Sequence, residues 1–558
     1  MDDVDSVQAQ IARNMLQSGD WVTARLDGVA YLEKSPLVYW MMAISFAVFG
    51  VHDWAARIPI ALSCILLGLL VQVIGEWAFG KKAGMYAGLC VVTCAGLFLF
   101  TRILIPDCIL TLTIAAAMYS VLRLVDDERR QIAWPMLFWA ALAVGVLLKG
   151  LIGIIFPVAI TVIYLTATRQ IFVRETWSRF RAVPGVLLFL AIAAPWHVLA
   201  TLRNPPLFDL TMHSESGSYR GFFWFYFINE HVLRFLNRRY PRDYNTVPPV
   251  LFWLLNLAWL FPWSFYLPGV FKLKYGRGDR GARVRLLAVC WIGVVLVFFT
   301  FSTTQEYYSM PCYPALALLI GSVLASGNKW ERMGSRAVAM FAAAALASTL
   351  IVLYLVRNAP TPGDIASALT QHPEAYSFSL GHMGDLRLDS FAYLRPPLAI
   401  AAVAFGIGAI GAWRWPLRHA AFSLALMMAL FIHAARLAMV SFDPYLSSPA
   451  LARSLLASPD GQLIVDGEYY GFSSVFFYTN RSGLLVNGRH VNLEYGSYAP
   501  GAPEIFIGDS DLAHLWREPD RRYLLVEGPK LPRIRGLLDD STLHLVKESG
   551  GKYLFTNQ

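Results

Sequence analysis

Charged side chains gather in the polar segments that flank long apolar runs. The first such segment, residues 1–54, begins with Asp2, Asp3 and Asp5 and later carries the pair Glu33–Lys34 in YLEKSPLVYW. Ionisable groups beside apolar segments are costly unless they have a function. Arg and Lys hold phosphate through charge-assisted hydrogen bonds, and carboxylates act as general bases or hold a divalent cation. These residue types predict a site for a phosphorylated substrate.

Later polar segments add the same residue types. Asp107 follows Pro106, Lys149 lies in VLLKGLIG, FINEHVLRF contains Glu230, His231 and Arg234, and Gln305, Glu306, Tyr307 and Tyr308 open another apolar run. Each has a simpler explanation. Asp107 can cap a helix, Lys149 can extend to the membrane surface, and Glu230 and Arg234 suit an ion pair within one helix. His231 alone favours a structural role. The coincidence of these groups on one face, rather than any single residue, indicates function.

The elements that position these residues are membrane helices. The chain of 558 residues is 56% hydrophobic and only 15% charged, with a mean hydropathy of +0.48. Soluble domains are typically about 45–50% apolar and about 25% charged. The net charge of +9 is divided among short loops, which argues against nucleic-acid binding. None of the six cysteines forms a CxxC pair, so neither a zinc site nor a disulfide framework is indicated.

Apolar runs long enough to cross a membrane as helices define the fold. They are Ala56–Trp77, Ala83–Phe100, Cys108–Leu124, Trp134–Leu148, Leu151–Thr166, Val183–Leu202, Pro249–Val270, Leu286–Phe301, Pro311–Leu324, Val338–Val356, Pro397–Ala412 and Ala420–Val440. Leu37–Gly50 is apolar but short, so a re-entrant or interfacial helix is expected there. The fold class predicted is therefore a mainly α, polytopic membrane protein.

The distribution of Lys and Arg predicts the orientation. Alternate loops are basic: they contain Lys81, Lys82, Arg129, Arg130, Arg169, Arg174, Arg179, Arg181, Lys272, Lys274, Arg277, Arg280, Arg283, Arg285, Lys329, Arg332, Arg336, Arg414 and Arg418. These loops are expected in the cytoplasm. The opposite set is expected outside: residues 1–54, Arg102–Asp107, 203–248, Ser302–Tyr308, 357–395 and the tail after 441. All the candidate site residues except Lys149, which lies within an apolar run, belong to this outer set.

The tail 445–558 is expected to be a separate, small α/β domain that follows a membrane domain of residues 1–440. Its pattern changes to alternating stretches divided by Gly and Pro. Strands are predicted at Leu463–Asp466, Ser474–Tyr478, Tyr523–Val526 and His544–Val546. The tail shows no catalytic constellation.

Several ordered motifs resemble one family. They are IARNMLQSGDWVTARLDGVAYLEKSPLVYWMMAISFAVFGVHDWAARIP, LLKG, APWHV, FWFYFINEHVLRF, FPW and YYSMPCYPALALLIG. Together they resemble the aminoarabinose transferase and protein O-mannosyltransferase-related glycosyltransferases over residues 1 to about 440, and the soluble tail fits the aminoarabinose branch. Departures from the family pattern include Ser35 in place of the first proline of EKPP, Gln305–Glu306 in place of a Lys-Leu pair, and an acidic cluster that lies further from the IAR segment than expected. They leave the donor sugar and the acceptor open.

The resemblance implies a type C glycosyltransferase bundle with about thirteen spans in the aminoarabinose branch. One fewer is counted here, so a span preceding residue 1 is expected. The resemblance further implies that an acidic residue of the first loop is catalytic, and Asp3 and Asp5 are the candidates. The resemblance also gives Asp107 as a matching acidic position, and Glu33, Lys34 and Arg234 as contacts to phosphate or metal. The full set of expected roles is catalysis by Asp107, phosphate binding by Lys34, Lys149, Arg234 and Tyr308, and binding of a divalent cation by Glu33, Asp107 and Glu230.

The expected activity is sugar transfer from a polyprenyl (undecaprenyl) phosphate carrier to a lipid A-like or other cell-envelope acceptor. The expected location is the periplasmic face of a bacterial inner membrane. The expected partners are the carrier-linked donor, a lipid or glycan acceptor and the membrane, without nucleic acid. A transporter of lipid-linked glycans is one alternative, but such proteins usually show broken, polar mid-span helices and repeated halves. A non-catalytic receptor is another, and it leaves the outward cluster of charges unexplained.

Overall fold

The computed structural model describes residues 1–126, 131–242, 246–370 and 379–558. Within these ranges, eight helices are long and apolar enough to cross a membrane. They are α3 (Asp53–Phe79), α6 (Asp107–Asp126), α10 (Ala182–Arg203), α14 (Arg280–Thr300), Glu306–Ala325 ending in α15 (Tyr313–Ala325), α16 (Lys329–Leu355), Asp389–Arg414 containing α17 (Arg395–Arg414), and α18 (Leu417–Leu446). The mainly α, multi-pass architecture predicted from the sequence is confirmed.

Two further spans are broken. The pairs are α4 (Lys81–Thr93) with α5 (Ala95–Thr101), bent by 46°, and α12 (Pro249–Trp259) with Trp263–Val270, bent by 98°. The breaks meet, because the backbone N–H of Ala95 donates to the carbonyl of Phe261 at 3.1 Å. The Trp263 indole also donates to the Thr93 hydroxyl at 3.0 Å. A backbone group freed by a break inside a membrane needs a partner within the protein, and each break supplies one to the other.

The two remaining predicted spans form helices that are shorter than a full membrane span. Helices α7 (Ala133–Lys149) and α8 (Ile152–Ala167) have 17 and 16 residues, against the roughly 20 of a full span. Gly150 separates them with a φ of 70°, so α7 ends directly after Lys149. The short apolar stretch near Leu37–Gly50 forms α2 (Leu37–Phe49).

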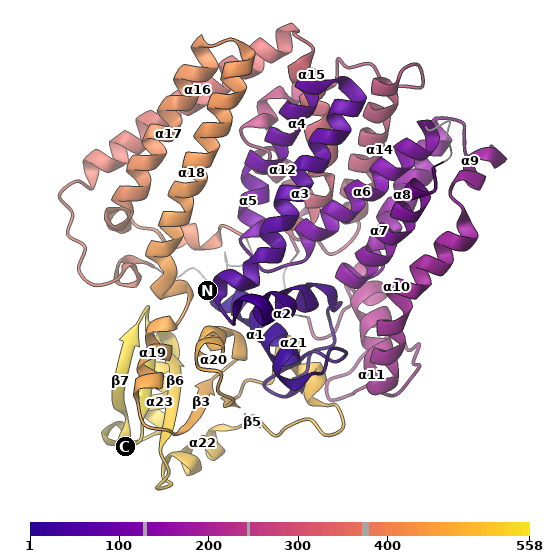
Figure 1. The fold of residues 1–558 in the computed structure, drawn as a ribbon. Helices are drawn as coiled ribbons and strands as arrows, with labels where there is room; N and C mark the ends of the chain where they lie inside the picture. The colour runs from indigo at the N-terminus through magenta and orange to yellow at the C-terminus, as the bar shows by residue number, and fades with distance from the viewer. Residues whose placement is uncertain (127–130, 243–245, 371–378) are drawn as a thin grey trace.

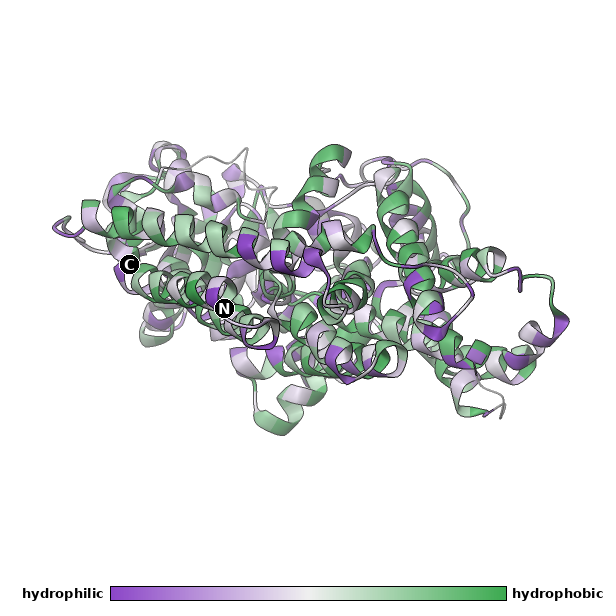
Figure 2. Cartoon of the chain, turned by 90° about the horizontal axis from the view of Figure 1, so that it is seen from above, coloured by the Kyte–Doolittle hydropathy of each residue, from purple (hydrophilic) through white to green (hydrophobic). Residues whose placement is uncertain are grey.

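Large apolar side chains cover the outside of the helix bundle. In α3, Leu62, Ile65 and Leu69 are each more than half exposed. In α10 and in α16, only 22% of the residues in the most apolar 18-residue stretch are buried. Figure 2 shows hydrophobic residues over most of the helices seen from above. Such a surface suits contact with lipid, since a water-facing helix would be polar on this side.

The C-terminal region forms one mixed sheet with the strand order β5-β4-β3-β6-β8-β7. The strands are β3 (Gln462–Asp466), β4 (Gly483–Val486), β5 (Phe506–Ile507), β6 (Arg522–Glu527), β7 (His544–Ser549) and β8 (Lys552–Thr556). Strands β3 to β6 pair in parallel, whereas β8 runs antiparallel to β6 and β7. The helices around the sheet are α19 (Pro449–Ala457), α20 (Ser473–Thr479), α21 (Val491–Ser497), α22 (Asp509–Trp516) and α23 (Leu531–Leu537). A small α/β domain is therefore present, as predicted.

One predicted strand of this domain is wrong. Ser474–Tyr478 forms helix α20 and not a strand. Its consecutive apolar residues Val475, Phe476 and Phe477 are all buried. A short continuous apolar run fits a buried helix as well as a buried strand, so the pattern alone could not decide.

The first 50 residues lie between the helix bundle and the C-terminal sheet (Figure 1). Helix α1 (Asp3–Ser18) packs against α20 and is followed by a hairpin of β1 (Arg25–Leu26) and β2 (Val29–Ala30). The hairpin turns at Asp27–Gly28, which both adopt positive φ. This is the geometry that Asp-Gly favours in a two-residue turn. The hairpin delivers the following residues, Tyr31 to Lys34, to the interface between the two domains.

Candidate functional site

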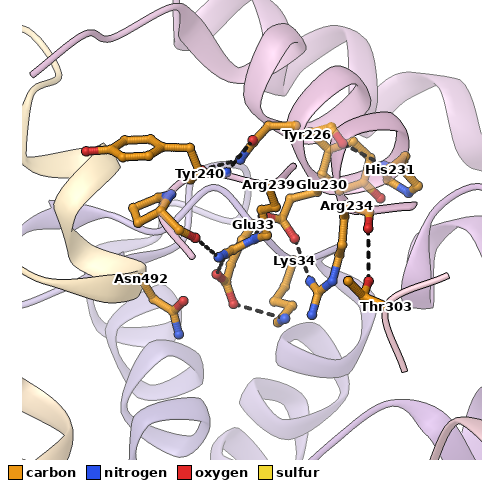
Figure 3. Close-up of polar contacts among 12 residues, drawn as sticks. Glu33, Lys34, Tyr226, Glu230, His231, Arg234, Arg239, Tyr240, Thr303 and Asn492 are labelled. Carbon is orange, nitrogen blue, oxygen red and sulfur yellow. Dashed lines mark hydrogen bonds and ion pairs between the residues drawn. The ribbon is translucent and has the colours of Figure 1, made fainter. Parts of the chain in front are cut away.

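Glu33 lies at the centre of the site, just before α2. Its carboxylate accepts a hydrogen bond from the Arg239 guanidinium at 2.8 Å and pairs with the Lys34 ammonium at 2.9 Å (Figure 3). It also accepts from the Tyr31 hydroxyl at 2.8 Å. Only 2% of the Glu33 side chain is exposed. A buried carboxylate is tolerated when opposite charges pair with it. Glu33 is therefore a fixed anion that orients the two cations beside it.

Arg239 joins Glu33 to a second carboxylate, and sequence analysis did not single it out. The guanidinium donates to Glu33, to Glu230 and to the carbonyl of Pro241, and 3% of its side chain is exposed. Three arginines occur in the local sequence NRRYPR, and no spacing distinguishes this one. Its role depends on contacts between loops that are about 200 residues apart, as the separation of 206 residues from Glu33 shows.

Glu230 and Arg234 belong to one helical segment, the π-helix η1 (Trp224–Leu233) and the residue that follows it. Their side chains form an i,i+4 ion pair at 2.7 Å, as their spacing allows. Arg234 also donates to the Tyr308 hydroxyl at 3.2 Å, and the Thr303 hydroxyl donates to the Arg234 carbonyl at 2.9 Å. The pair is thus connected to a second outer loop, and π-helical turns are frequent at functional sites.

Lys149 and Asp107 form a further ion pair at 2.5 Å, although 42 residues separate them. Asp107 begins α6 and Lys149 ends α7. The sequence offered no acidic neighbour for Lys149, and the packing of these two helices provides one. The ammonium also lies 4.6 Å from the centre of the Tyr308 ring, a distance that allows a cation–π contact.

One continuous network includes these groups. It runs through Lys34, Glu33, Arg239, Glu230, Arg234, Tyr308, Lys149 and Asp107. The structure thus brings Lys34, Arg234 and Asp107 into one network. Three cations of the network are partly exposed, with side-chain exposures of 38% for Lys34, 22% for Lys149 and 19% for Arg234. The carboxylates expose at most 3%, so an incoming group meets positive charge.

The charge states of Glu33 and Lys34 follow from this arrangement. Burial opposes ionisation of Glu33, but Lys34 and Arg239 outweigh it and lower its pKa to about 2. Burial likewise disfavours the Lys34 ammonium, yet Glu33 outweighs that effect and raises the lysine's pKa above its usual value. Both groups are therefore ionised at neutral pH. Glu33 is too weak a base to take a proton, and its role is to hold cations.

His231 is a structural residue, as predicted. Its Nε2 accepts from the backbone N–H of Leu151 at 3.1 Å, so its Nδ1 is the donor to the Tyr226 carbonyl at 2.5 Å. Burial lowers its pKa, which favours the neutral ring that this pattern needs. A Cβ on Gly150 would lie 2.0 Å from His231 Nε2, so the turn after Lys149 requires glycine.

The aspartates of the first loop have different surroundings. Asp5 accepts from the Leu104 N–H at 2.7 Å and pairs with Arg57. Burial, with Asp2 adding to it and Arg57 opposing it, raises the pKa of Asp5 to about 6. Asp3 instead binds the C-terminal domain, since its carboxylate contacts Lys552 at 2.6 Å and the Ser474 N–H at 2.8 Å. The contacts of Asp5 reach the segment that enters α6, whereas those of Asp3 join two domains.

The arrangement does not fit a divalent cation held by Glu33, Asp107 and Glu230. Arg239 lies between the two glutamates, and Lys149 pairs with Asp107. Over the described ranges, no group of three or more His, Cys, Asp or Glu side chains is placed to hold a metal ion. In this structure the Arg239 guanidinium supplies the positive charge between Glu33 and Glu230.

Comparison with known proteins agrees with this architecture. A family model described as dolichyl-phosphate-mannose-protein mannosyltransferase matches residues 33–198. An undecaprenyl phosphate-alpha-4-amino-4-deoxy-L-arabinose arabinosyl transferase of Aeromonas salmonicida is 29% identical over 56% of this chain, and the match spans about half, 54%, of that relative. A protein of the same name from Erwinia tasmaniensis is 25% identical over 92% of this chain and 86% of its own length.

The fold is also that of a solved membrane protein. ArnT from Cupriavidus metallidurans in the apo state superposes with a TM-score of 0.76 at 21% identity, covering 100% of this chain and 93% of ArnT. A second structure of ArnT, bound to undecaprenyl phosphate, gives a TM-score of 0.75. The type C bundle with a small C-terminal α/β domain is thus the fold of this chain. By its motifs and its sequence relatives the chain is similar to the aminoarabinose transferases and protein O-mannosyltransferase-related proteins, and it shares the fold of ArnT.

Proposed function

We propose that this protein transfers a sugar from an undecaprenyl phosphate carrier to a lipid A-type acceptor. The observation that carries the proposal is the set of open cations Lys34, Lys149 and Arg234 above buried carboxylates. Such a set recognises a phosphate that joins a sugar to a lipid, and the apolar exterior admits the lipid. The names of the relatives and the undecaprenyl phosphate bound to ArnT support the same substrate class.

In the proposed reaction the acceptor oxygen attacks the anomeric carbon from the side opposite the phosphate. A new C–O bond forms as the bond from the anomeric carbon to the phosphate oxygen breaks. Undecaprenyl phosphate leaves with the bonding electrons, and its increased negative charge is stabilised by Lys34, Lys149 and Arg234. Cations already fixed by Glu33, Asp107 and Glu230 need no reorganisation at that moment, which is the main source of electrostatic catalysis.

Asp5 is the proposed general base when the acceptor is a hydroxyl group. A carboxyl whose pKa is raised to about 6 is ionised at neutral pH and is a stronger base than an ordinary aspartate. A phosphate acceptor is already ionised and needs no base. Asp107 is paired with Lys149 and is assigned to holding that lysine, and Asp3 to joining the domains.

The sugar, the acceptor and the orientation belong to the same proposal. Aminoarabinose is the donor sugar that the relatives' names favour, and a hexose is the alternative. The distribution of basic residues among the loops supports a periplasmic location of the network at a bacterial inner membrane. The tail after α18 then lies on that side as well, where it can contact the acceptor.

Transfer by purified protein tests the proposal. The protein in detergent is incubated with lipid A and radiolabelled undecaprenyl phosphate-linked aminoarabinose or hexose, and labelled lipid A is measured. We expect label transfer from one donor and none when Lys34 and Arg234 are both changed to Met. Movement of the intact donor across liposomes without transfer would instead support the transporter alternative.

A further inference from the structure

The C-terminal domain inserts two segments among the outer loops that build the site. One is the turn Tyr469–Phe472 and the other is α21 (Val491–Ser497). Tyr495 anchors α21: it is buried and stacks on Phe225, with the ring centres 4.0 Å apart. Its hydroxyl accepts from the Arg220 N–H at 2.9 Å and donates to the Gly221 carbonyl at 3.0 Å. These contacts fix α21 against the loop that carries Glu230 and Arg239.

The first segment leads to Glu33 through two tyrosines. Tyr31 has one hydroxyl proton, which it donates to Glu33 at 2.8 Å. The Tyr470 hydroxyl, 3.0 Å from that of Tyr31, must then be the donor of their hydrogen bond. Asn492 in turn donates its amide to the Tyr470 oxygen at 2.7 Å. The relay has one direction, from Asn492 through Tyr470 and Tyr31 to Glu33.

The second segment leads to Arg239. The Tyr240 hydroxyl donates to Glu494 of α21. The backbone of Tyr240 is fixed by Asn229, whose amide oxygen accepts from the Tyr240 N–H at 2.9 Å and whose amide nitrogen donates to the Tyr240 carbonyl at 2.5 Å. Arg239 precedes Tyr240 directly, so Glu494 and Asn229 hold the backbone from which Arg239 reaches Glu33. Asn492 and Tyr240 approach the Glu33–Arg239 pair from the same side in Figure 3.

We propose that the C-terminal domain positions the Glu33–Arg239 pair of the site. Tyr470 acts on Glu33 through Tyr31, and Glu494 acts on Arg239 through Tyr240. Tyr470 and Glu494 are positioning residues and touch no reacting atom. The domain thereby sets the geometry of the cations that receive the phosphate, although it carries no catalytic group of its own. This inference rests on the proposed function, because its main readout is sugar transfer.

A double-mutant cycle in the full-length protein tests the relay. Tyr470→Phe and Tyr31→Phe each remove one hydroxyl and keep the ring. If Tyr470 acts through Tyr31, each change lowers kcat by about 10-fold, and the double variant is no slower than Tyr31→Phe alone. A merely structural role would make the two losses multiply, to about 100-fold. Multiplied losses, or unchanged kcat in Tyr470→Phe, would overturn the inference.

The matched control is Tyr523→Phe. Tyr523 is a buried tyrosine of the same domain, and its hydroxyl donates to the Pro459 carbonyl at 2.7 Å, outside the relay. We expect this variant to keep wild-type kcat even if its melting temperature falls. The pair Tyr240→Phe and Glu494→Ala forms a second cycle with the same expectation, so the inference does not depend on the folding of a single variant.

Hydrogen–deuterium exchange separates this inference from the proposed function. Backbone amides of residues 29–36 should exchange faster in Tyr470→Phe than in wild type or in Tyr523→Phe, whether or not sugar is transferred. A wild-type protein without transfer activity would overturn the proposed function but leave this readout intact. Active wild-type protein with unchanged exchange in Tyr470→Phe would overturn the relay alone.

Discussion

Lys34 is the most exposed cation of the network, with Arg234 beside it (Figure 3). Changing either to Met should lower kcat/KM for the carrier-linked sugar by roughly 10- to 100-fold, because a hydrogen bond to a charged group contributes about 1.5–3 kcal/mol. Transfer rates at varied donor concentration measure this. Lys272→Met, which removes an exposed lysine of a basic loop, is the control and should match wild type. Equal losses in all three variants would mean that general surface charge, not the network, binds the donor.

The raised pKa of Asp5 predicts that the rate of sugar transfer depends on pH. Because its pKa is raised to about 6, Asp5 is protonated below that pH and cannot accept a proton. For a hydroxyl acceptor, kcat/KM should therefore fall as the pH drops through about 6, and Asp5→Asn should be slow at every pH. Asp27 is a useful control, since burial raises its pKa to about 6 as well, in the hairpin turn.

The variants Asp27→Asn and Asp3→Asn should keep the acidic limb of the pH–rate profile. An Asp5→Asn variant with full activity and the same limb would rule out Asp5 as the base. With a phosphate acceptor no such limb is expected, so the profile also reports which kind of acceptor reacts.

Side-chain identity predicted much of the site. Glu33, Lys34 and Arg234 stood out because charged residues beside apolar runs are costly, and the structure joins them in one network. Arg239 and Tyr31 could not be found in that way: the first is one of three arginines in NRRYPR, and the second is one of 25 tyrosines. The separate surroundings of Asp3 and Asp5 could not be predicted either, because they depend on Lys552 and Arg57, which lie far away in the chain.

At the scale of elements, each predicted span coincides with a helix or a bent helix pair, but apolar length did not predict the bends, and α7 and α8 are shorter than a full span. Hydropathy does not show where a helix breaks, so Ala83–Phe100 and Pro249–Val270 were predicted as single spans, and both are bent. In the tail, Leu463–Asp466, Tyr523–Val526 and His544–Val546 coincide with strands, and Ser474–Tyr478 does not. Short buried segments carry too little periodicity to distinguish a helix from a strand.

The turn between α7 and α8 yields a further prediction. Gly150→Ala places a Cβ against His231 in a backbone conformation that disfavours alanine. Gly217 also has a positive φ, but a Cβ there meets no atom within 4 Å. Gly217→Ala should lower stability by about 1 kcal/mol from backbone strain alone, and Gly150→Ala by more. Melting temperatures in detergent measure both.

The Gly150→Ala variant should also lose transfer activity, because the displaced turn carries Lys149 away from Asp107. Retained activity together with a lowered melting temperature would show that the Lys149–Asp107 pair tolerates this movement. Equal melting temperatures in the two glycine variants would show that His231 can move away from the added methyl group with no further loss of stability.

At the scale of the whole molecule, the two domains share buried contacts. Lys552 binds Asp3, and Tyr495 lies in the apolar cluster beside η1. Deleting residues 445–558 should therefore lower both the melting temperature and the transfer activity, because it leaves Asp3 without its cation and exposes Phe225. A truncated protein with more than half of wild-type activity would contradict this. A receptor whose tail alone binds the ligand would instead keep that binding in the isolated tail.

The paired breaks of α4–α5 and α12 tie two distant parts of the bundle to each other. The amide of Ala95 and the carbonyl of Phe261 satisfy one another where water is scarce. Were either helix straightened alone, the other would keep an orphaned polar group in a hydrocarbon environment, at a cost of several kcal/mol. Across relatives these two kinks should accordingly be inherited together or be absent together, so that one predicts the other in any homologue.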